Sequence, residues 1–197
     1  MHAIGKRIDN KRSIELVSIL RHGTSKIVKP DSDGYVPIQD LLTLKSFREF
    51  NTDSFYRLAE EDKKKRYEIK ESGGQAFIKA CQGHTISINN TSIQKITTQQ
   101  AQSYGFIIHG TNNKCWQKIR QTGINRMNRQ HIHFARDDEN AISGIPSGCT
   151  VFLYVDMVGA INDGYEFFQS ANGVIVSPGD STGCLPPKYI IKVKTGS

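Results

Sequence analysis

The sequence predicts an α+β protein with two lobes: a winged-helix-like lobe over residues 1–90 and a β-sandwich or split-barrel lobe over residues 104–197. Two observations support this division. Helical patterns gather in the first half, whereas short β-rich runs interrupted by glycines fill the second half. Between them, residues 91–103 are polar and show little periodicity, which is typical of a linker.

The first predicted element is an amphipathic helix in the segment DNKRSIELVSILRHG. We expect Asp9 or Asn10 to cap its start and Gly23 to end it, because these residue types satisfy helix ends. Four aliphatic side chains are expected to share its apolar face: Ile14, Leu16, Val17 and Leu20.

The next elements follow in the order strand, helix, helix and hairpin. A turn at residues 33–34 leads into a short strand at 35–36 and a short helix from Pro37. A second clear helix follows, capped by Thr52 or Asp53 and carrying lysines at its end. Alternating strands around a Ser-Gly-Gly turn then predict a hairpin within residues 66–80. This order is typical of winged-helix domains, which often present a basic helix and wing to nucleic acid. A purely structural lobe with solvated charges is an equal alternative.

The second half contains five short β-rich runs, GFIIHGT, HIHFA, TVFLYVDM, YEFFQS and GVIVSP. One helix, NKCWQKIRQTGI, follows the first run. This pattern favours a compact β-sandwich or split barrel with few helices.

Composition narrows the classes of function. The net charge of +7 favours anionic partners such as nucleic acid or nucleotides. No apolar run approaches the ~18 residues needed to span a membrane. The four cysteines form no CxxC or Cys/His cluster, so we expect neither a zinc site nor a disulfide framework. GxGxxG and GxxxxGK[ST] motifs are absent, which disfavours Rossmann and P-loop sites.

Two short motifs carry groups capable of chemistry. In the run HIH, alternation along a strand puts His131 and His133 on one face, but a metal site would need a third ligand and we expect no metal. In the run LRHG, Arg21 and His22 fall at a helix C-terminus. An arginine there can satisfy terminal carbonyls or clamp a phosphate.

Six segments appear in one order and together resemble a known family: LVSILRHG, DGYVPIQDLL, IKACQGHT, HGT, HIHFA and FFQSANGVIVSPG with LPPKY. The sequence resembles the RNA 2'-phosphotransferase family (Tpt1/KptA) over roughly residues 13–192. The resemblance implies a winged-helix-like lobe that faces RNA and an ADP-ribosyltransferase-like lobe that binds NAD. It also implies a soluble monomer in the cytoplasm or nucleus, with no membrane partner.

The resemblance implies a two-step reaction on RNA that carries an internal 2'-phosphate, as in spliced tRNA. The 2'-phosphate first attacks the ribose of NAD and releases nicotinamide. The ribose 2''-hydroxyl then attacks the phosphate, which releases 2'-hydroxyl RNA and ADP-ribose 1'',2''-cyclic phosphate. No metal is required.

The family's Arg-His-Arg-Arg catalytic group maps incompletely onto this sequence. Its first pair matches Arg21 and His22, its second arginine matches Lys79, and its last matches Pro146. Lysine keeps the charge but loses the planar fork, and proline keeps neither. Because Arg136 is the nearest arginine to Pro146, an insertion could let it substitute. An enzyme that stops after the first step and a non-catalytic RNA-binding relative therefore stay as alternatives.

The NAD-contacting positions that the resemblance implies are all present. They are His84, His109, Gly110, Thr111, His131, His133, Ser170, Asn172 and Gly173. The glycines are expected to let the backbone approach the dinucleotide closely. For His109 and His131, packing in the core is the alternative.

Overall fold

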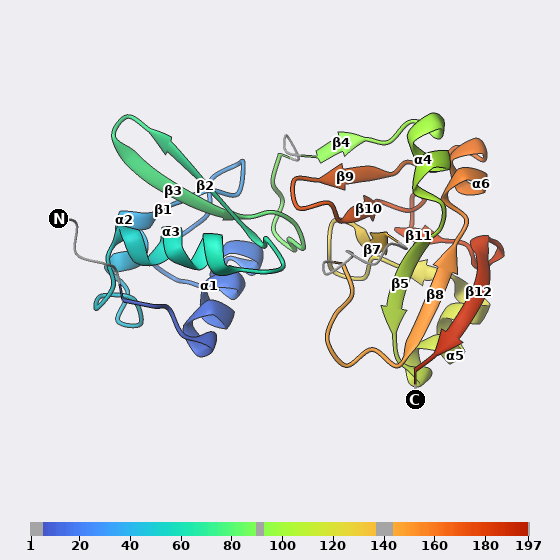
Figure 1. Ribbon diagram of the computed structural model, residues 1–197, viewed down its shortest axis with the longest axis horizontal. Coiled ribbons are helices and arrows are strands. Elements are labelled where there is room, and N and C mark those ends of the chain that lie inside the picture. The colour runs from blue at the N-terminus through green and yellow to red at the C-terminus, as the bar shows by residue number, and fades with distance from the viewer. Residues whose placement is uncertain (1–5, 90–92, 137–143, 197) are drawn as a thin grey trace. The chain divides into compact units, whose positions relative to one another are not determined.

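The computed structural model describes residues 6–89, 93–136 and 144–196. The chain divides into two compact units, Met1–Thr91 (unit 1) and Ser92–Ser197 (unit 2). Both units combine helices with antiparallel sheets, as expected for an α+β protein (Figure 1). No helix in the described ranges combines the length and apolar character needed to cross a membrane.

Unit 1 opens with helix α1 (Asn10–His22), whose ends follow the predicted signals. The Asp9 side chain accepts a hydrogen bond from the backbone of Arg12, and Gly23 ends the helix with a φ of 59°. The predicted apolar face was wrong at Ile14, which is 62% exposed. The buried face instead contains Leu16, Ile19 and Leu20, spaced by three and four residues as one helix face requires.

The next three elements are β1 (Val36–Pro37), α2 (Ile38–Leu42) and α3 (Thr52–Glu61). The expected caps of α3, Thr52 or Asp53, were wrong by one or two residues. Asn51 caps it in a capping box with Ser54, because both side chains reach the other residue's backbone N–H. The lysines expected at the helix end, residues 63–65, lie beyond it.

The predicted hairpin is confirmed as β2 (Tyr67–Ser72) and β3 (Gln75–Ala80). Gly73 and Gly74 form the turn with φ values of 58° and 74°, which favour glycine. The sheet order is β1-β3-β2. One face of this sheet packs with the helices in a shared core. The sheet contributes Tyr67 and Ile78, and the helices contribute Leu16, Leu20 and Phe55.

The linker expected over residues 91–103 was wrong where the structure describes it, from residue 93 onward. Strand β4 (Ile93–Lys95) pairs antiparallel with β9, and helix α4 (Thr98–Tyr104) follows. Thr97 and Gln100 form a capping box, and Ala101 is fully buried. This segment is therefore an integral part of unit 2.

Unit 2 contains a seven-stranded antiparallel sheet in the order β12-β8-β5-β7-β10-β9-β4. Its remaining strands are β5 (Ile107–Thr111), β7 (Ile132–Arg136), β8 (Val151–Val155), β9 (Phe168–Ser170), β10 (Ile175–Ser177) and β12 (Ile190–Thr195). Strand β7 pairs with both β5 and β10, so all seven strands belong to one hydrogen-bonded sheet. The expected β-sandwich or split barrel stays a prediction.

The smaller elements of unit 2 cover this sheet and its ends. They are α5 (Asn113–Thr122), α6 (Met157–Asn162), the 3-10 turn η1 (Pro187–Tyr189) and a two-stranded ladder of β6 (Ile124–Asn125) with β11 (Cys184–Leu185). Trp116 and Ile119 of α5 pack against a core that includes Phe134 and Leu153.

Candidate functional site

In unit 1 the loop after β3 docks onto the C-terminus of α1. The backbone N–H of Thr85 donates to the carbonyl of Arg21 at 2.9 Å, and Nδ1 of His22 lies 3.0 Å from Oγ1 of Thr85. Gly83 has a φ of +90°, and a side chain there would come within 3.2 Å of the Arg21 guanidinium carbon. Arg21 and His22 are therefore held together with the Gln-Gly-His-Thr segment, although more than 60 residues separate them in sequence.

Lys79 lies at the end of β3, directly opposite Glu68 of β2. Its side chain is only 4% exposed, and Nζ lies 3.5 Å from Oε1 of Glu68. The same carboxylate oxygen accepts a hydrogen bond of 2.5 Å from the hydroxyl of Tyr35, whose ring centre is 4.4 Å from the Lys79 ammonium. Burial and the Glu68 carboxylate raise the pKa of Tyr35, so the phenol stays neutral and donates.

The positive charges of Arg21 and Lys79 both act electrostatically on the thiol of Cys81. Burial and Glu68 raise the pKa of this thiol to about 12, while Lys79 and Arg21 act in the opposite direction. A thiol with this pKa is no nucleophile at neutral pH. The cationic groups around it, rather than the cysteine, are therefore the candidates for chemistry.

His84 is buried, with 4% exposure. A side chain at Gly34 would come within 3.4 Å of its Nε2, so the ring packs against the turn before β1. This is an environment internal to unit 1, and contact between His84 and a cofactor stays a prediction.

In unit 2 two of the predicted histidines are packed by aromatic rings. Nδ1 of His109 lies 3.0 Å from the carbonyl of His133, and its ring meets Phe134 edge-on at 5.9 Å. The ring of His131 lies 6.4 Å from that of Phe168. Burial lowers the pKa of both His109 and His131, so both imidazoles are neutral at pH 7.

Strand β7 arranges the other predicted NAD contacts along a line. Its start, with His131 and His133, lies beside residues 109–111, because the first residues of β5 pair with the last ones of β7. The turn at residues 171–174 lies beside the far end, because β10 pairs with β7 from Ile175 onward. Along β7, about two residues, or roughly 7 Å, separate His133 from the position beside Val174.

Gly110 and Gly173, the two glycines among the predicted NAD contacts, differ in the space beside them. A side chain at Gly110 would come within 2.7 Å of Ile145 and 2.9 Å of the Cys149 sulfur, so its missing side chain makes room for the protein's own packing. This differs from the expectation that Gly110 admits a ligand. Gly173 has a φ of +81° and open space on its side-chain position, as a tight turn that faces a ligand would need.

Ser170 and Asn172 build that turn. Oγ of Ser170 lies 2.8 Å from Oδ1 of Asn172 and 2.9 Å from the carbonyl of Val174. The hydroxyl of Ser170 is buried and fixes the turn. Asn172 is half-buried and is the better placed of the two for an outside partner.

Pro146, which is expected to match the family's last arginine, carries no charge. Pro146 is exposed in the bend before β8. The guanidinium of Arg136 lies 4.5 Å from the ring centre of Tyr104, at the end of α4. Residues 137–143, which include part of the segment expected around Pro146, lie outside the described residues.

Sequence reasoning missed two arginines close to the histidines of unit 2. Besides burial, the positive charge of Arg126 lowers the pKa of His131, and that of Arg129 lowers the pKa of His109. Nη1 of Arg126 also donates to the carbonyl of Arg129 at 2.7 Å. A signal was available, because residues 112–136 contain no acidic residue.

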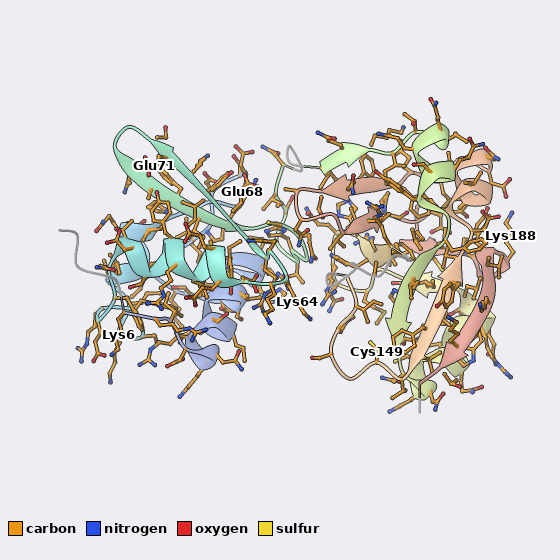
Figure 2. The ribbon with its side chains drawn as sticks, in the orientation of Figure 1. Lys6, Lys64, Glu68, Glu71, Cys149 and Lys188 are labelled. Carbon is orange, nitrogen blue, oxygen red and sulfur yellow. The ribbon has the colours of Figure 1, made fainter. Side chains whose placement is uncertain are left out.

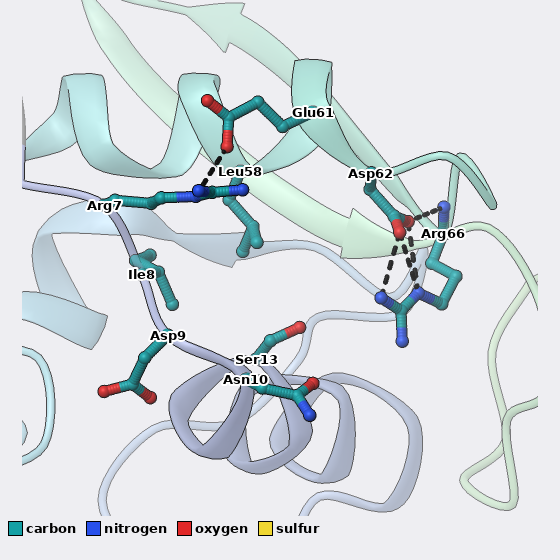
Figure 3. A pocket seen from close by; sticks show the side chains of 9 residues that line it. All are labelled: Arg7, Ile8, Asp9, Asn10, Ser13, Leu58, Glu61, Asp62 and Arg66. Atoms are coloured by element: carbon teal, nitrogen blue, oxygen red, sulfur yellow. Dashed lines mark hydrogen bonds and ion pairs between the residues drawn. The ribbon is translucent and has the colours of Figure 1, made fainter.

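A hollow of about 440 Å³ in unit 1 is lined by none of the residues predicted for the functional site (Figure 3). It lies at the start of α1 and the end of α3. Its charges satisfy one another, since Arg7 pairs with Glu61 at 3.0 Å and Arg66 with Asp62 at 2.9 Å. Across the described parts of the chain, no three His, Cys, Asp or Glu side chains gather as metal ligands would.

Comparison with known proteins assigns the chain to a family. It matches the RNA 2'-phosphotransferase, Tpt1 / KptA family over residues 7–179. It is 33% identical to tRNA 2'-phosphotransferase 1 of Danio rerio, across 96% of this chain and 89% of that protein. It is 38% identical to the Mus musculus protein of the same name (86% and 70%) and 36% identical to that of Homo sapiens (92% and 74%). The chain belongs to the RNA 2'-phosphotransferase family.

Proposed function

We propose that this chain is a NAD-dependent RNA 2'-phosphotransferase that acts on internal 2'-phosphates of spliced tRNA. It would work as a monomer in the cytoplasm or nucleus. The observation that carries the proposal is the docking of the loop at residues 83–85 onto Arg21 and His22. The names of the relatives support tRNA as the substrate.

The residues of unit 1 would bind the phosphate and manage its protons. Arg21 offers a planar fork that suits two phosphate oxygens. Lys79 adds a compact charge to the same group. The bond between His22 and Thr85 orients an imidazole able to move a proton at the 2'-oxygen. In this proposal unit 1 is the winged-helix-like lobe that meets RNA.

The residues of unit 2 suit NAD in shape and charge. Neutral imidazoles at His109 and His131 feel the charges of Arg129 and Arg126, and the turn at Gly173 offers open space. An elongated dinucleotide with a pyrophosphate needs such an arrangement. When bound, NAD supplies the ribose carbon that takes up the phosphate, nicotinamide as leaving group, and the 2''-hydroxyl that yields ADP-ribose 1'',2''-cyclic phosphate. Unit 2 is then the ADP-ribosyltransferase-like lobe.

A second candidate is an enzyme that stops after the first transfer. Two observations favour it: Lys79 shares its charge with Glu68, and Pro146 provides no cation. Loss of one charge-stabilising donor typically costs about 10²–10³ in rate. If the second transfer needs the missing arginine, RNA would accumulate with its phosphate still attached and additional mass.

The proposal is tested with a 2'-phosphorylated oligonucleotide incubated with and without NAD, with mass spectrometry of the RNA. Loss of one phosphate only when NAD is present supports the first candidate. A gain in mass supports the second. Unchanged RNA in the presence of NAD would leave only a binding relative. Arg21→Ala and His22→Ala should each abolish the NAD-dependent change, and Lys192→Ala, exposed on β12, is the matched control.

A further inference from the structure

The β2–β3 hairpin turns one face toward the core of unit 1 and the other away from it. The core face includes Tyr67, Ile69, Ile78 and Ala80. Because side chains alternate along strands, the other face carries Glu68, Lys70, Phe77 and Lys79. Tyr35, although only 7% exposed, is outside the core cluster. Its ring lies beside this outer face.

The ammonium groups of two lysines lie close to the aromatic ring of Tyr35. Nζ of Lys70 is 3.6 Å from the ring centre of Tyr35, and Nζ of Lys79 is 4.4 Å from it. The two nitrogens are therefore within about 8 Å of each other. Phe77 lies 5.7 Å from the Lys70 ammonium and packs beside it. Aromatic rings hold both lysines in place through cation–π attraction.

Two lysines and the Glu68 carboxylate surround the Tyr35 ring, and the Asp31 carboxylate accepts a hydrogen bond from the backbone N–H of Tyr35. Glu68 is 3.5 Å from Lys79 and accepts a hydrogen bond from Tyr35. In the parts of the chain that the structure describes, Lys70 forms no ion pair. The nearby Glu71 accepts a hydrogen bond from Tyr56 instead. Lys70 is half-buried, so an RNA strand can reach it.

We propose that Lys70 binds the 3'-phosphodiester of the nucleotide whose 2'-phosphate meets Lys79. This inference rests on the proposed function. An internal 2'-phosphate and the adjacent 3'-phosphodiester sit on neighbouring oxygens of one ribose. Two ammonium groups within about 8 Å of each other offer one cation to each of two such neighbouring anions. The pair would distinguish an internal 2'-phosphate from one on the last nucleotide, where the 3'-oxygen bears no phosphate.

The test compares equilibrium binding of two oligonucleotides of the same sequence. One carries an internal 2'-phosphate, and the other carries a 2'-phosphate on its last nucleotide, with a 3'-hydroxyl. Lys70→Gln should weaken binding of the internal substrate about tenfold and leave the terminal one within about twofold. The slope of log affinity against log salt should fall by about 0.7 for the internal substrate. Lys79→Gln should weaken both.

Two further variants serve as controls. Lys70→Arg keeps the charge and should retain most of the preference for the internal substrate. Lys192→Gln removes a lysine that also lies near a tyrosine ring, 5.2 Å from Tyr154, and should change neither affinity. Equal weakening of both oligonucleotides by Lys70→Gln, or no weakening of either, would overturn the assignment. So would a wild type with no preference between them.

Failure of this inference can be told apart from failure of the proposed function. Binding is measured without NAD, whereas turnover needs it. If binding shows a preference that depends on Lys70 but no turnover occurs, the inference about Lys70 stands and the proposed enzymatic function fails. If turnover occurs without that preference, the proposed function stands and the inference about Lys70 fails.

Discussion

Glu68 is the residue whose replacement tests the environment of Lys79 most severely. Glu68→Gln keeps the shape of the side chain and an acceptor for Tyr35, but it removes the charge opposite an ammonium that is only 4% exposed. Two unit charges 3.5 Å apart attract by about 5 kcal/mol at an effective dielectric constant of 20. Because the Glu68 side chain is 34% exposed, water screens part of this attraction. Breaking a fully buried pair costs about 3–5 kcal/mol, so we expect a loss of about 2 kcal/mol.

Glu71→Gln is the matched control for this experiment. Glu71 lies on the same strand and also accepts a 2.5 Å hydrogen bond from a tyrosine, Tyr56, but it is exposed (Figure 2). In the described residues it forms no ion pair. We expect its replacement to cost less than about 0.5 kcal/mol.

Native-state hydrogen exchange of the β2–β3 amides measures this loss within unit 1. For Glu68→Gln the slowest amides should exchange about 30-fold faster, as about 2 kcal/mol requires. The double variant with Lys79→Met removes both charges and should recover most of the loss. Equal effects of Glu68→Gln and Glu71→Gln would show that the ion pair contributes nothing particular, as would a double variant no more stable than Glu68→Gln alone.

Three further predictions concern the two units. Thr85→Val should slow turnover about tenfold and shift its pH profile, because His22 loses the hydroxyl that orients it; an unchanged profile would contradict this role. Gly110→Ala should destabilise unit 2 by about 1–3 kcal/mol in urea denaturation, since the new methyl meets packed side chains at 2.7 Å. The lowered pKa values of His109 and His131 mean that protons bind the unfolded chain more readily. Stability should therefore be full above pH ~6.5 and fall as the pH drops below it, a decline that His109→Gln should reduce.

Local backbone chemistry accounts for the parts of the fold that sequence predicted well. The caps at Asp9 and Gly23 and the Gly73–Gly74 turn each depend on a few neighbouring residues. The segment from residue 93 was mistaken for a linker because β4 gains its partner, β9, from about 75 residues further along the chain. Sequence periodicity does not report such a pairing.

The candidate site was predictable to a similar degree. A two-residue turn fixes the register of the hairpin, so the pairing of Glu68 with Lys79 could have been predicted from it. The approach of Tyr35 to that pair could not, since it depends on how β1 joins β3. The contact between Thr85 and His22 likewise arises only from tertiary packing.

The most direct test of the proposed activity is a single-turnover assay with excess protein, NAD and 5'-labelled RNA that bears one internal 2'-phosphate. We expect complete conversion to 2'-hydroxyl RNA, with any phosphate-bearing RNA of higher mass appearing only transiently. Accumulation of that species as the end product would show that Lys79 and Pro146 do not support the second transfer. RNA that keeps its phosphate unmodified, from protein that still binds NAD, would contradict the proposal that this chain acts as an RNA 2'-phosphotransferase.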